Sequence, residues 1–321
     1  MPRKRKGIPI DGWLAVDKPV GIGSTTVVSI LRRLTNAAKI GHGGTLDPLA
    51  SGILPIALGE ATKTVSYVMD GAKTYRVVVA WGEARSTEDR EGEVIATSPV
   101  RPDRDAISAA LPAFTGDILQ VPPAFSAIKV AGERAYDLAR AGAAVELAPR
   151  LVRIDRIALL AMPDADHAEF EVECGKGTYI RSLARDLAVA LGTVGHVAAL
   201  RRTACGPFDE SSAISLDKLQ ELGQGPALRT HLLPIETALD DIPALALTEA
   251  EARRLMSGQA LPLAGLAGRE APTPPPGTNV RAMQGARLVA LARIDGGTLR
   301  PVRVILQPSS SGEDDVDYAR A

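Results

Sequence analysis

The sequence predicts an α+β protein that ends in a small, mostly β module. Residues 168–192 (AEFEVECGKGTYIRSLARDLAVALG) combine a strand of alternating polarity, a glycine turn and an amphipathic helix. Near the end of the chain, RLVALARI and TLRPVRVIL alternate on either side of Asp295-Gly296-Gly297, which is typical of a hairpin. The length of 321 residues suggests about two domains, and we place their boundary near Pro243.

The first half of the chain mixes strands with short helices. DGWLAVDKP (11–19) is predicted to be a strand that ends at its proline. STTVVSILRRLTN (24–36) is predicted to be a helix, because apolar residues recur at helical spacing and Ser24 or Thr25 can cap its start. TYRVVVAWG (74–82) alternates as a strand that begins near Tyr75.

Shorter elements complete the prediction. RPDRDAISAALPAF (101–114) indicates a short helix stopped by proline, and PPAFSAIKVAGERAYDLARAG (122–142) indicates a turn and then a helix that ends near Gly142. Beyond the boundary we expect one helix from Thr248 to Ser257 and a proline-rich loop, APTPPPG. The acidic segment SSSGEDDVDYARA (309–321) is predicted to be disordered.

Composition excludes several classes of protein. The net charge of −1 does not by itself indicate a nucleic-acid binder, although a basic face can exist within a neutral total. Cys174 and Cys205 are predicted to be reduced thiols of a cytoplasmic protein, and the four histidines lack ligand spacing, so we expect no metal. The basic start MPRKRKG is not followed by an unbroken apolar run, and no run is long enough to span a membrane.

A nucleotide-binding loop is the first chemical candidate. VDKPVGIGSTTVV places a glycine-rich turn between a strand and a helix, where phosphate can bind. A P-loop requires lysine directly before the Ser/Thr, and Gly23 stands there; Thr26 occupies the third glycine position of GxGxxG. We therefore do not expect nucleotide binding at this turn.

Asp47 is the second candidate, in the stretch GHGGTLDPLASGILPIALG (41–59). Aspartate before proline commonly starts a turn, and that interpretation competes with a catalytic one. One carboxylate is insufficient for ordinary glycoside hydrolysis, but it can attack a carbon whose leaving group needs little protonation. Such a carboxylate must stay ionised, so a cation is expected nearby. Arg181 can be that cation, or it can be a solvated arginine on a helix face.

Aromatic and basic residues are weaker candidates. Tyr75 and Tyr179 can stack on a base, although ordinary packing explains either one alone. Several basic residues lie in pairs along the chain, which is usual for solvated surfaces, and they bind phosphate only if the fold gathers them on one side. They are Arg32-Arg33, Lys129 with Arg134, Lys176 with Arg181 and Arg185, and Arg201-Arg202.

Five segments, taken together, resemble the bacterial TruB-type tRNA pseudouridine synthases that act on position 55. They occur in the order of that family and span about residues 10 to 220, and the C-terminal module is similar to a degenerate PUA domain. The segments are LAVDKPVG (its N-terminal motif), GHGGTLDPLASGILPIALG (its catalytic motif), TYRVVVAWG (its tyrosine segment), PPAFSAIKVAGERAYDLARAG (its RNA-gripping thumb) and CGKGTYIRSLARDLA (its third motif).

The resemblance implies a fold and a reaction. The fold is α+β, with a mixed, mainly antiparallel central sheet flanked by helices and an active cleft across its middle. Residues 8–242 form the catalytic domain with a thumb at about 120–145, residues 243–308 a PUA-like RNA-binding domain, and residues 309–321 the tail. The enzyme isomerises the uridine at position 55 of the tRNA T-loop without cofactor or metal. We expect a monomer that binds the T-loop and stem and no membrane.

The resemblance also implies roles for individual residues. Asp47 is the essential acid, and three routes are open to it: attack on the anomeric carbon, attack on the uracil ring, or removal of a sugar proton. Arg181 pairs with Asp47. By the same resemblance, Tyr75 stacks on the base, Tyr179 contacts the flipped uridine and Leu200 packs beside it. His42 contacts the RNA, and Lys18 supports the loop under the substrate.

Two other functions compete with this hypothesis, and the sequence departs from the family pattern at three places. A non-catalytic RNA-binding protein or tRNA chaperone would keep an RNA groove without needing Asp47, and a synthase could act on another RNA. Gly43 stands where the family usually has threonine, and Gly23 where it has serine. The proline-rich insertion AGREAPTPPPG interrupts the PUA-like module.

Overall fold

The computed structural model describes residues 7–126, 128–130, 132–143, 145–266 and 275–306. A ten-stranded sheet has the order β14-β1-β3-β12-β4-β11-β10-β7, with β2 beside β3 and β13 beside β12. Only β1 with β14 and β3 with β12 run parallel, so the prediction of a mixed, mainly antiparallel sheet is confirmed. Its strands are β1 (Gly12–Lys18), β2 (Ile40–His42), β3 (Ala50–Leu58), β4 (Lys73–Trp81), β7 (Gly116–Gln120), β10 (Arg150–Ala161), β11 (His167–Cys174), β12 (Gly195–Cys205), β13 (Phe208–Asp209) and β14 (Ala213–Ser215).

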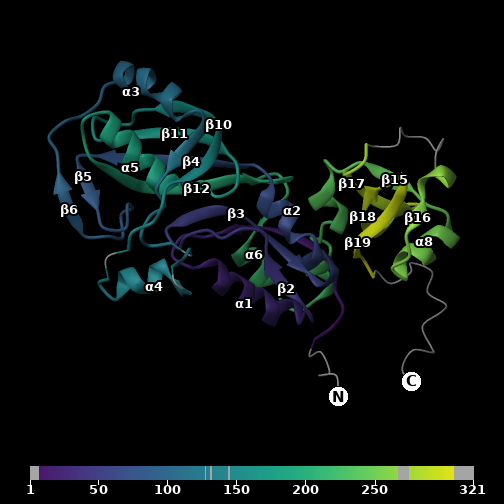
Figure 1. The fold of residues 1–321 in the computed structure, drawn as a ribbon. Coiled ribbons are helices and arrows are strands. Elements are labelled where there is room, and N and C mark those ends of the chain that lie inside the picture. Colours follow the sequence, from purple (N-terminus) through teal and green to yellow (C-terminus); the bar gives the residue numbers. More distant parts are fainter. Residues whose placement is uncertain (1–6, 127, 131, 144, 267–274, 307–321) are drawn as a thin grey trace.

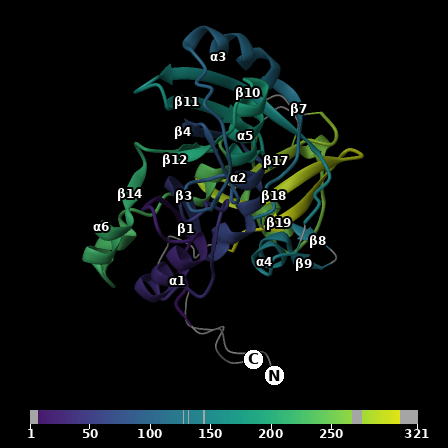
Figure 2. The same ribbon diagram turned by 90° about the vertical axis from the view of Figure 1, so that its left-hand side faces the viewer.

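Helices cover this sheet in two groups (Figures 1 and 2). α1 and α6 lie beside the half that contains β1 and β3, while α5 and α3 lie beside the half that contains β4, β11 and β10. α4 follows the small hairpin of β8 and β9, on the side of the molecule opposite to the C-terminal strands. The helices are α1 (Ser24–Thr35), α2 (Val65–Asp70), α3 (Arg104–Ala110), α4 (Ala135–Arg140), α5 (Ile180–Ala190), α6 (Leu216–Leu222), α7 (Pro226–Arg229) and α8 (Glu249–Met256); the hairpins are β5 (Glu83–Arg85) with β6 (Val94–Thr97), and β8 (Lys129–Val130) with β9 (Glu133–Arg134).

The predicted strand at 11–19 and helix at 24–36 correspond to β1 and α1, but the predicted cap of α1 is wrong. Gly23 is the N-cap residue and provides no side-chain bond. The hydroxyl of Ser24 instead accepts from the Leu46 amide at 2.8 Å and donates to the Leu46 carbonyl at 3.0 Å. Ser24 therefore attaches the start of α1 to the segment that carries Asp47.

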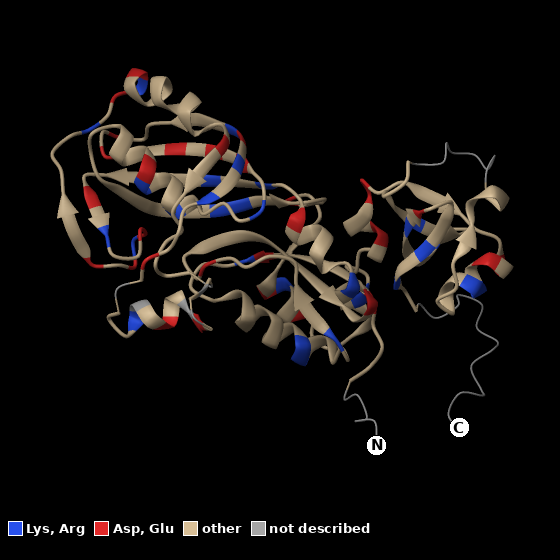
Figure 3. Ribbon diagram, in the orientation of Figure 1, with Lys and Arg blue, Asp and Glu red and all other residues tan. Residues whose placement is uncertain are grey.

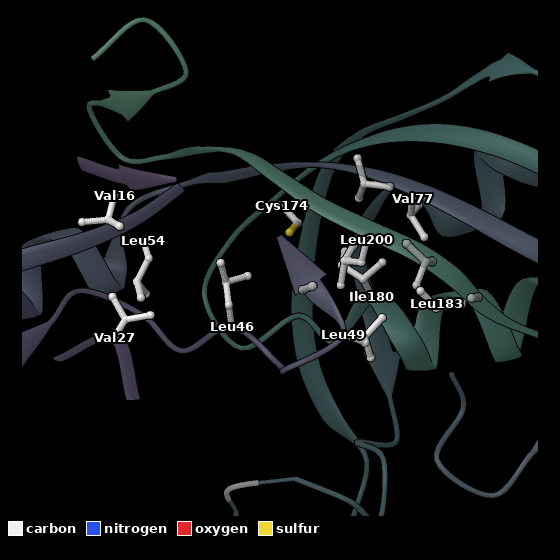
Figure 4. Packing of buried hydrophobic residues seen from close by; sticks show 14 of the residues in the cluster. Val16, Val27, Leu46, Leu49, Leu54, Val77, Cys174, Ile180, Leu183 and Leu200 are labelled. Atoms are coloured by element: carbon white, nitrogen blue, oxygen red, sulfur yellow. The ribbon is translucent and has the colours of Figure 1, made fainter. Parts of the chain in front are cut away.

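One apolar core runs under both halves of the large sheet. The alternation predicted for β11 is confirmed, because Phe170, Val172 and Cys174 are buried while the glutamates between them are partly exposed. Figure 4 shows Leu46 and Leu49 between the side chains of the first half, such as Leu54, and those of the second half. Because Asp47 lies between these two buried leucines, the core itself fixes the ends of its loop.

A second sheet, in the order β15-β17-β18-β19-β16, forms the C-terminal module. The predicted hairpin is confirmed: β18 and β19 pair across Gly296 and Gly297, whose φ angles of 51° and 77° suit glycine in a tight turn. The predicted helix corresponds to α8. Most of the proline-rich insertion and the acidic tail at 309–321 lie outside the described residues. The strands are β15 (Ala244–Ala246), β16 (Leu261–Pro262), β17 (Asn279–Gln284), β18 (Arg287–Asp295) and β19 (Thr298–Val304).

The C-terminal module packs directly on the large sheet. Leu288 and Leu291 belong to the same buried cluster as Trp13 and Ile53. Polar bonds flank this contact: the Lys63 ammonium donates to the Val304 carbonyl at 2.7 Å, and the Leu306 amide donates to Glu60 at 2.8 Å. The two sheets are thus joined by a shared core. No helix among the described residues has the length and apolar character needed to cross a membrane.

Candidate active site

A cleft of about 580 Å³ opens where the two halves of the large sheet meet. Its volume is within the range of small-ligand sites. It brings Asp47, Tyr75, Tyr179, Arg181 and Leu200 together from four separate regions of the chain. Its lining consists of residues 44–47, Met69, Asp70, Lys73, Tyr75, Ser126, residues 175–181, Leu200 and Arg202.

Asp47 occupies the loop between β2 and β3. Its carbonyl accepts from the Ala50 amide at 3.1 Å, so the turn expected of Asp-Pro is present. The Pro48 carbonyl accepts from the Gly21 amide at 2.8 Å, which ties the loop to the turn after β1. The side chain of Asp47 is 37% exposed and faces the cleft. The backbone is therefore fixed while the carboxylate stays accessible to a substrate.

Arg181 is the cation beside that carboxylate. Its Nε lies 2.9 Å from Oδ2 of Asp47, and its side chain is only 5% exposed. Nη1 donates to the Thr87 carbonyl at 3.0 Å and Nη2 to the Phe125 carbonyl at 2.9 Å. The alternative of a solvated arginine on a helix face is wrong, because every nitrogen of the guanidinium has a protein partner.

Asp89 is a second carboxylate that sequence reasoning missed. Its Oδ2 lies 3.8 Å from Nε of Arg181, and its side chain is 5% exposed. Oδ1 accepts from the Thr87 hydroxyl at 2.6 Å and from the Glu91 amide at 3.0 Å. Asp89 lies between β5 and β6 in a polar segment (STEDREG) without hydrophobic periodicity, so nothing in the pattern separated it from an ordinary surface turn.

Tyr75 and Leu200 face the cleft from neighbouring strands. Tyr75 on β4 pairs in register with Arg202 on β12, and Leu200 lies two residues earlier on that same face of β12. Burial raises the pKa of Tyr75 to about 12, while the Arg202 guanidinium acts in the opposite direction. Tyr75 is thus a neutral phenol at physiological pH, and its half-buried side chain is part of the cleft lining.

Tyr179 is held at the start of α5 by a residue that sequence reasoning also missed. The buried Gln120 on β7 accepts from the Tyr179 amide at 2.8 Å and donates to the Tyr179 carbonyl at 3.1 Å. Burial raises the pKa of the Tyr179 phenol. A single amide side chain therefore fixes the backbone at the point where the third motif turns into helix.

Lys18 and His42 lie outside the lining of the cleft. Lys18 is fully buried, and its ammonium donates to the carbonyls of Pro19 and Ile22, both at 2.9 Å. Burial lowers its pKa to about 8, while Asp47 acts to raise it. The position of Lys18 fits support of the loop rather than direct contact with substrate. His42 ends β2, and burial followed by the charge of Arg202 lowers its pKa.

Arg202 is a third missed residue. We grouped it with Arg201 as a possible solvated pair, but Arg202 is 1% exposed. Its guanidinium donates to the carbonyls of Ile53, Gly44 and Thr45. Arg201, on the opposite face of β12, instead forms surface ion pairs with Asp17 and Glu210. Because successive side chains of a strand point to opposite faces of the sheet, the two neighbouring arginines lie in different surroundings. The dipeptide sequence alone does not reveal this difference.

Basic and acidic residues are interspersed along the ribbon of the described residues, as Figure 3 shows. Lys176, at the mouth of the cleft, lies 2.9 Å from the Asp70 carboxylate. Arg185 pairs with Glu88 and with Asp186. The described residues contain no group of three or more His, Cys, Asp or Glu side chains arranged to hold a metal ion. The cleft thus combines the accessible Asp47 carboxylate and the buried Arg181 with two tyrosines, and a second exposed carboxylate, Asp70, lies in its lining.

Known proteins are similar to this chain in sequence and in fold. Residues 32–180 match the TruB family pseudouridylate synthase (N terminal domain), and residues 181–240 match the tRNA pseudouridylate synthase B C-terminal domain. The tRNA pseudouridine synthase B of Rhodospirillum rubrum is 61% identical over 309 residues, which are 95% of this chain and 99% of that protein. The enzyme of the same name from Gluconacetobacter diazotrophicus is 60% identical over 306 residues, 94% of this chain and 100% of that protein.

Solved structures support the fold. A chain of the archaeal box H/ACA sRNP Nop10-Cbf5 complex is 27% identical, with a TM-score of 0.68 over 92% of this chain and 86% of its own length. A chain of an H/ACA RNP bound to a substrate RNA containing 2'-deoxyuridine is 24% identical, with a TM-score of 0.70 over 96% of this chain and 92% of its own length. The likeness covers both sheets of this protein.

Proposed function

This chain belongs to the TruB family of pseudouridylate synthases, and we propose that it isomerises the uridine at position 55 of the tRNA T-loop, with Asp47 as the essential acid. The enzyme is a tRNA pseudouridine synthase. It is similar to tRNA pseudouridine synthases over nearly the full length of those relatives. The observation that carries the role of Asp47 is its accessible carboxylate, held 2.9 Å from a buried arginine inside the cleft.

The reaction exchanges one bond for another within the bound nucleotide. The bond between N1 of uracil and C1′ of ribose breaks, the base turns, and C5 bonds to C1′. C5 then loses its hydrogen to solvent, and N1 carries a proton in the product. Nothing is oxidised or reduced overall, so no external electron donor enters the balance.

Asp47 supplies the charge that this exchange needs. Its carboxylate can attack C1′, attack the uracil ring or remove a sugar proton, and in each case it must be ionised. Nε of Arg181 lies 2.9 Å from that carboxylate and forms an ion pair with it. Uracil leaves as a stabilised anion and remains in the cleft, which reduces the need for a second acid. This cleft can thus break the bond at C1′ with one carboxylate, whereas glycosidases use two to break a glycosidic bond.

The neighbouring side chains hold the base. Tyr75 stacks on uracil, Tyr179 contacts the flipped nucleotide and Leu200 packs beside it. Flipping a uridine out of a folded loop costs a few kcal/mol, which contacts between the protein and the rest of the loop offset. The segment at about 120–145, whose α4 lies on the side opposite to the C-terminal sheet (Figure 1), supplies part of that grip. His42 contacts the RNA near the flipped nucleotide.

The remaining assignments extend this proposal. The division into two sheets supports residues 8–242 as the catalytic domain and residues 243–308 as a PUA-like RNA-binding domain. The enzyme acts as a monomer in the cytoplasm, on tRNA recognised through its T-loop and stem. The rival function of a non-catalytic tRNA chaperone does not account for the buried Arg181, which is fixed by two carbonyls so that it faces one accessible carboxylate.

The position of the product tests the proposal. A tRNA transcript should acquire pseudouridine at position 55 and nowhere else, and the same transcript with cytidine at position 55 should acquire none. Reverse-transcription mapping of carbodiimide-modified pseudouridine detects the product. Pseudouridine at a different site, or unchanged incorporation into the cytidine variant, would reject the substrate assignment while leaving the synthase activity in place.

A further inference from the structure

β12 is the strand that joins the two halves of the large sheet. Arg202 lies at that junction: it pairs in register with Gly52 of β3 on one side and with Tyr75 of β4 on the other. At Gly52, φ is +101°, and a Cβ placed there would lie 2.1 Å from the Arg202 carbonyl oxygen. The backbone of Arg202 is therefore in direct contact with the strand that leaves the Asp47 loop.

The side chain of Arg202 reaches back into that loop. Nη2 donates to the Gly44 carbonyl at 3.0 Å, Nη1 approaches the Thr45 carbonyl at 3.4 Å, and Nε donates to the Ile53 carbonyl at 2.7 Å. Gly44 and Thr45 are the third and second residues before Asp47. On the other side of the loop, the hydroxyl of Ser24 holds Leu46. Asp47 therefore extends from a backbone that is fixed immediately before it by two side chains from different elements.

The charge of Arg202 is unusual for so buried a residue. Among the described residues no carboxylate lies within ion-pair distance of it, and its hydrogen bonds go to neutral carbonyls and to the neutral Tyr75 phenol. A buried cation without a counter-ion is unfavourable for folding, so a neutral donor would hold the loop at lower cost. The charge acts on its surroundings, because it contributes to lowering the pKa values of His42 and Lys18.

We propose that Arg202 is a positioning residue of the reaction, which fixes the loop of Asp47 against Tyr75 and keeps a positive charge beside the cleft. The planar, forked guanidinium of Arg202 keeps the Asp47 carboxylate at a fixed distance from the Tyr75 ring on which the base stacks. Its charge lies in the lining of the cleft, where it favours the anionic form of the base while the base rotates. The inference rests on the proposed function of Asp47 and Tyr75, and adds a residue of the cleft lining that acts through the Asp47 loop rather than on the carboxylate itself.

Matched variants of neighbouring arginines test this role. Arg202→Met removes the fork and the charge, Arg202→Lys keeps a charge but loses the fork, and Arg201→Met removes a surface arginine of the same strand. The assay is single-turnover release of tritium from tRNA labelled at C5 of uridine, at saturating enzyme, together with the Kd for tRNA and the thermal unfolding temperature.

We expect the single-turnover rate to fall about 100-fold in Arg202→Met and about tenfold in Arg202→Lys, since a displacement near 1 Å has effects of this size. The Kd for tRNA should stay within about threefold, as phosphate contacts are unchanged. Arg201→Met should keep the wild-type rate within about threefold. In Arg202→Met, the pKa of His42, followed by NMR of its ring protons, should rise.

Two results would overturn the inference. In the first, Arg202→Met keeps the wild-type single-turnover rate. In the second, the rate falls only as much as the affinity for tRNA or the fraction of folded protein falls. If Arg202→Met does not fold, Arg202→Lys decides, and a wild-type rate in that variant rejects the role of the fork. Failure of the proposed role of Asp47 is a different result, since Asp47→Asn would then release tritium at the wild-type rate or the wild-type enzyme itself would release none.

Discussion

Nε of Arg181 lies 2.9 Å from Oδ2 of Asp47, although the two residues are 134 positions apart in the chain. The arginine is almost completely buried and its two other nitrogens are bound to carbonyls, so it cannot turn away from the carboxylate. The aspartate is partly exposed. The pair thus combines a fixed, buried guanidinium with an accessible carboxylate, which is the arrangement that the proposed chemistry requires.

Removing this cation should slow the reaction. In Arg181→Met the carboxylate loses its charge partner, and we expect kcat to fall by about 100-fold, the size seen when one preorganised donor is lost. Arg181→Lys should recover only part of the rate, because a lysine does not reproduce the planar fork. Steady-state tritium release measures both. Arg33→Met, at an exposed arginine of α1, is the control; equal rates in it and in Arg181→Met would contradict the role of the pair.

The clamp on Tyr179 gives a prediction about both stability and substrate. Gln120→Leu removes two hydrogen bonds to the Tyr179 backbone and leaves that amide unpaired, while the carbonyl keeps its bond from the Leu183 amide at 3.0 Å. We expect a loss of about 1 to 3 kcal/mol in the free energy of unfolding, and a weaker contact between Tyr179 and the nucleotide. Urea denaturation and the KM for tRNA test the two effects. A variant with wild-type stability and KM would show that Gln120 does not fix this turn.

Lys18 gives a prediction about pH. Its pKa is about 8 in the folded protein, against an ordinary value of 10.5. Between these values the unfolded chain binds more protons, so the contribution of Lys18 to stability rises with pH. Relative to Lys18→Met, the wild-type protein should gain about 2 kcal/mol of unfolding free energy between pH 7.5 and 10. Urea unfolding at the two pH values measures this, and an unchanged difference between the proteins would contradict the shift.

The shared core makes a prediction about truncation. Deleting residues 245–321 would remove Leu288 and Leu291 from the buried cluster that also contains Trp13 and Ile53. We expect a lower thermal unfolding temperature of the remaining chain as well as weaker binding of tRNA. Calorimetry and filter binding separate the two. A truncated chain as stable as the full protein would show that the module is only a binding appendage.

Much of the fold could be predicted from local patterns. The alternation in β4 and β11, the stripe in α5 and the Gly-Gly hairpin each specify their element within a few residues. Asp47, Tyr75, Tyr179, Arg181 and Leu200 were predicted as site residues through resemblance, and the structure places them in one cleft. Their chemical roles remain proposals.

The missed residues share a physical cause. Asp89, Gln120 and Arg202 are polar side chains whose burial depends on partners distant in sequence, such as Arg181 for Asp89 and Tyr179 for Gln120. Neither periodicity nor a short motif reports such long-range contacts. The cap of α1 was wrong for the same reason, because Ser24 bonds to Leu46 across 22 positions rather than to its own helix.

The most direct test of the central claim is tritium release from tRNA labelled at C5 of its uridines, with the wild-type enzyme and Asp47→Asn side by side. We expect release of about one tritium per tRNA by the wild type and none by Asp47→Asn, with tRNA binding by the variant within about tenfold because phosphate contacts remain. Release by Asp47→Asn at the wild-type rate, or no release by either protein despite tight binding of tRNA, would contradict the claim.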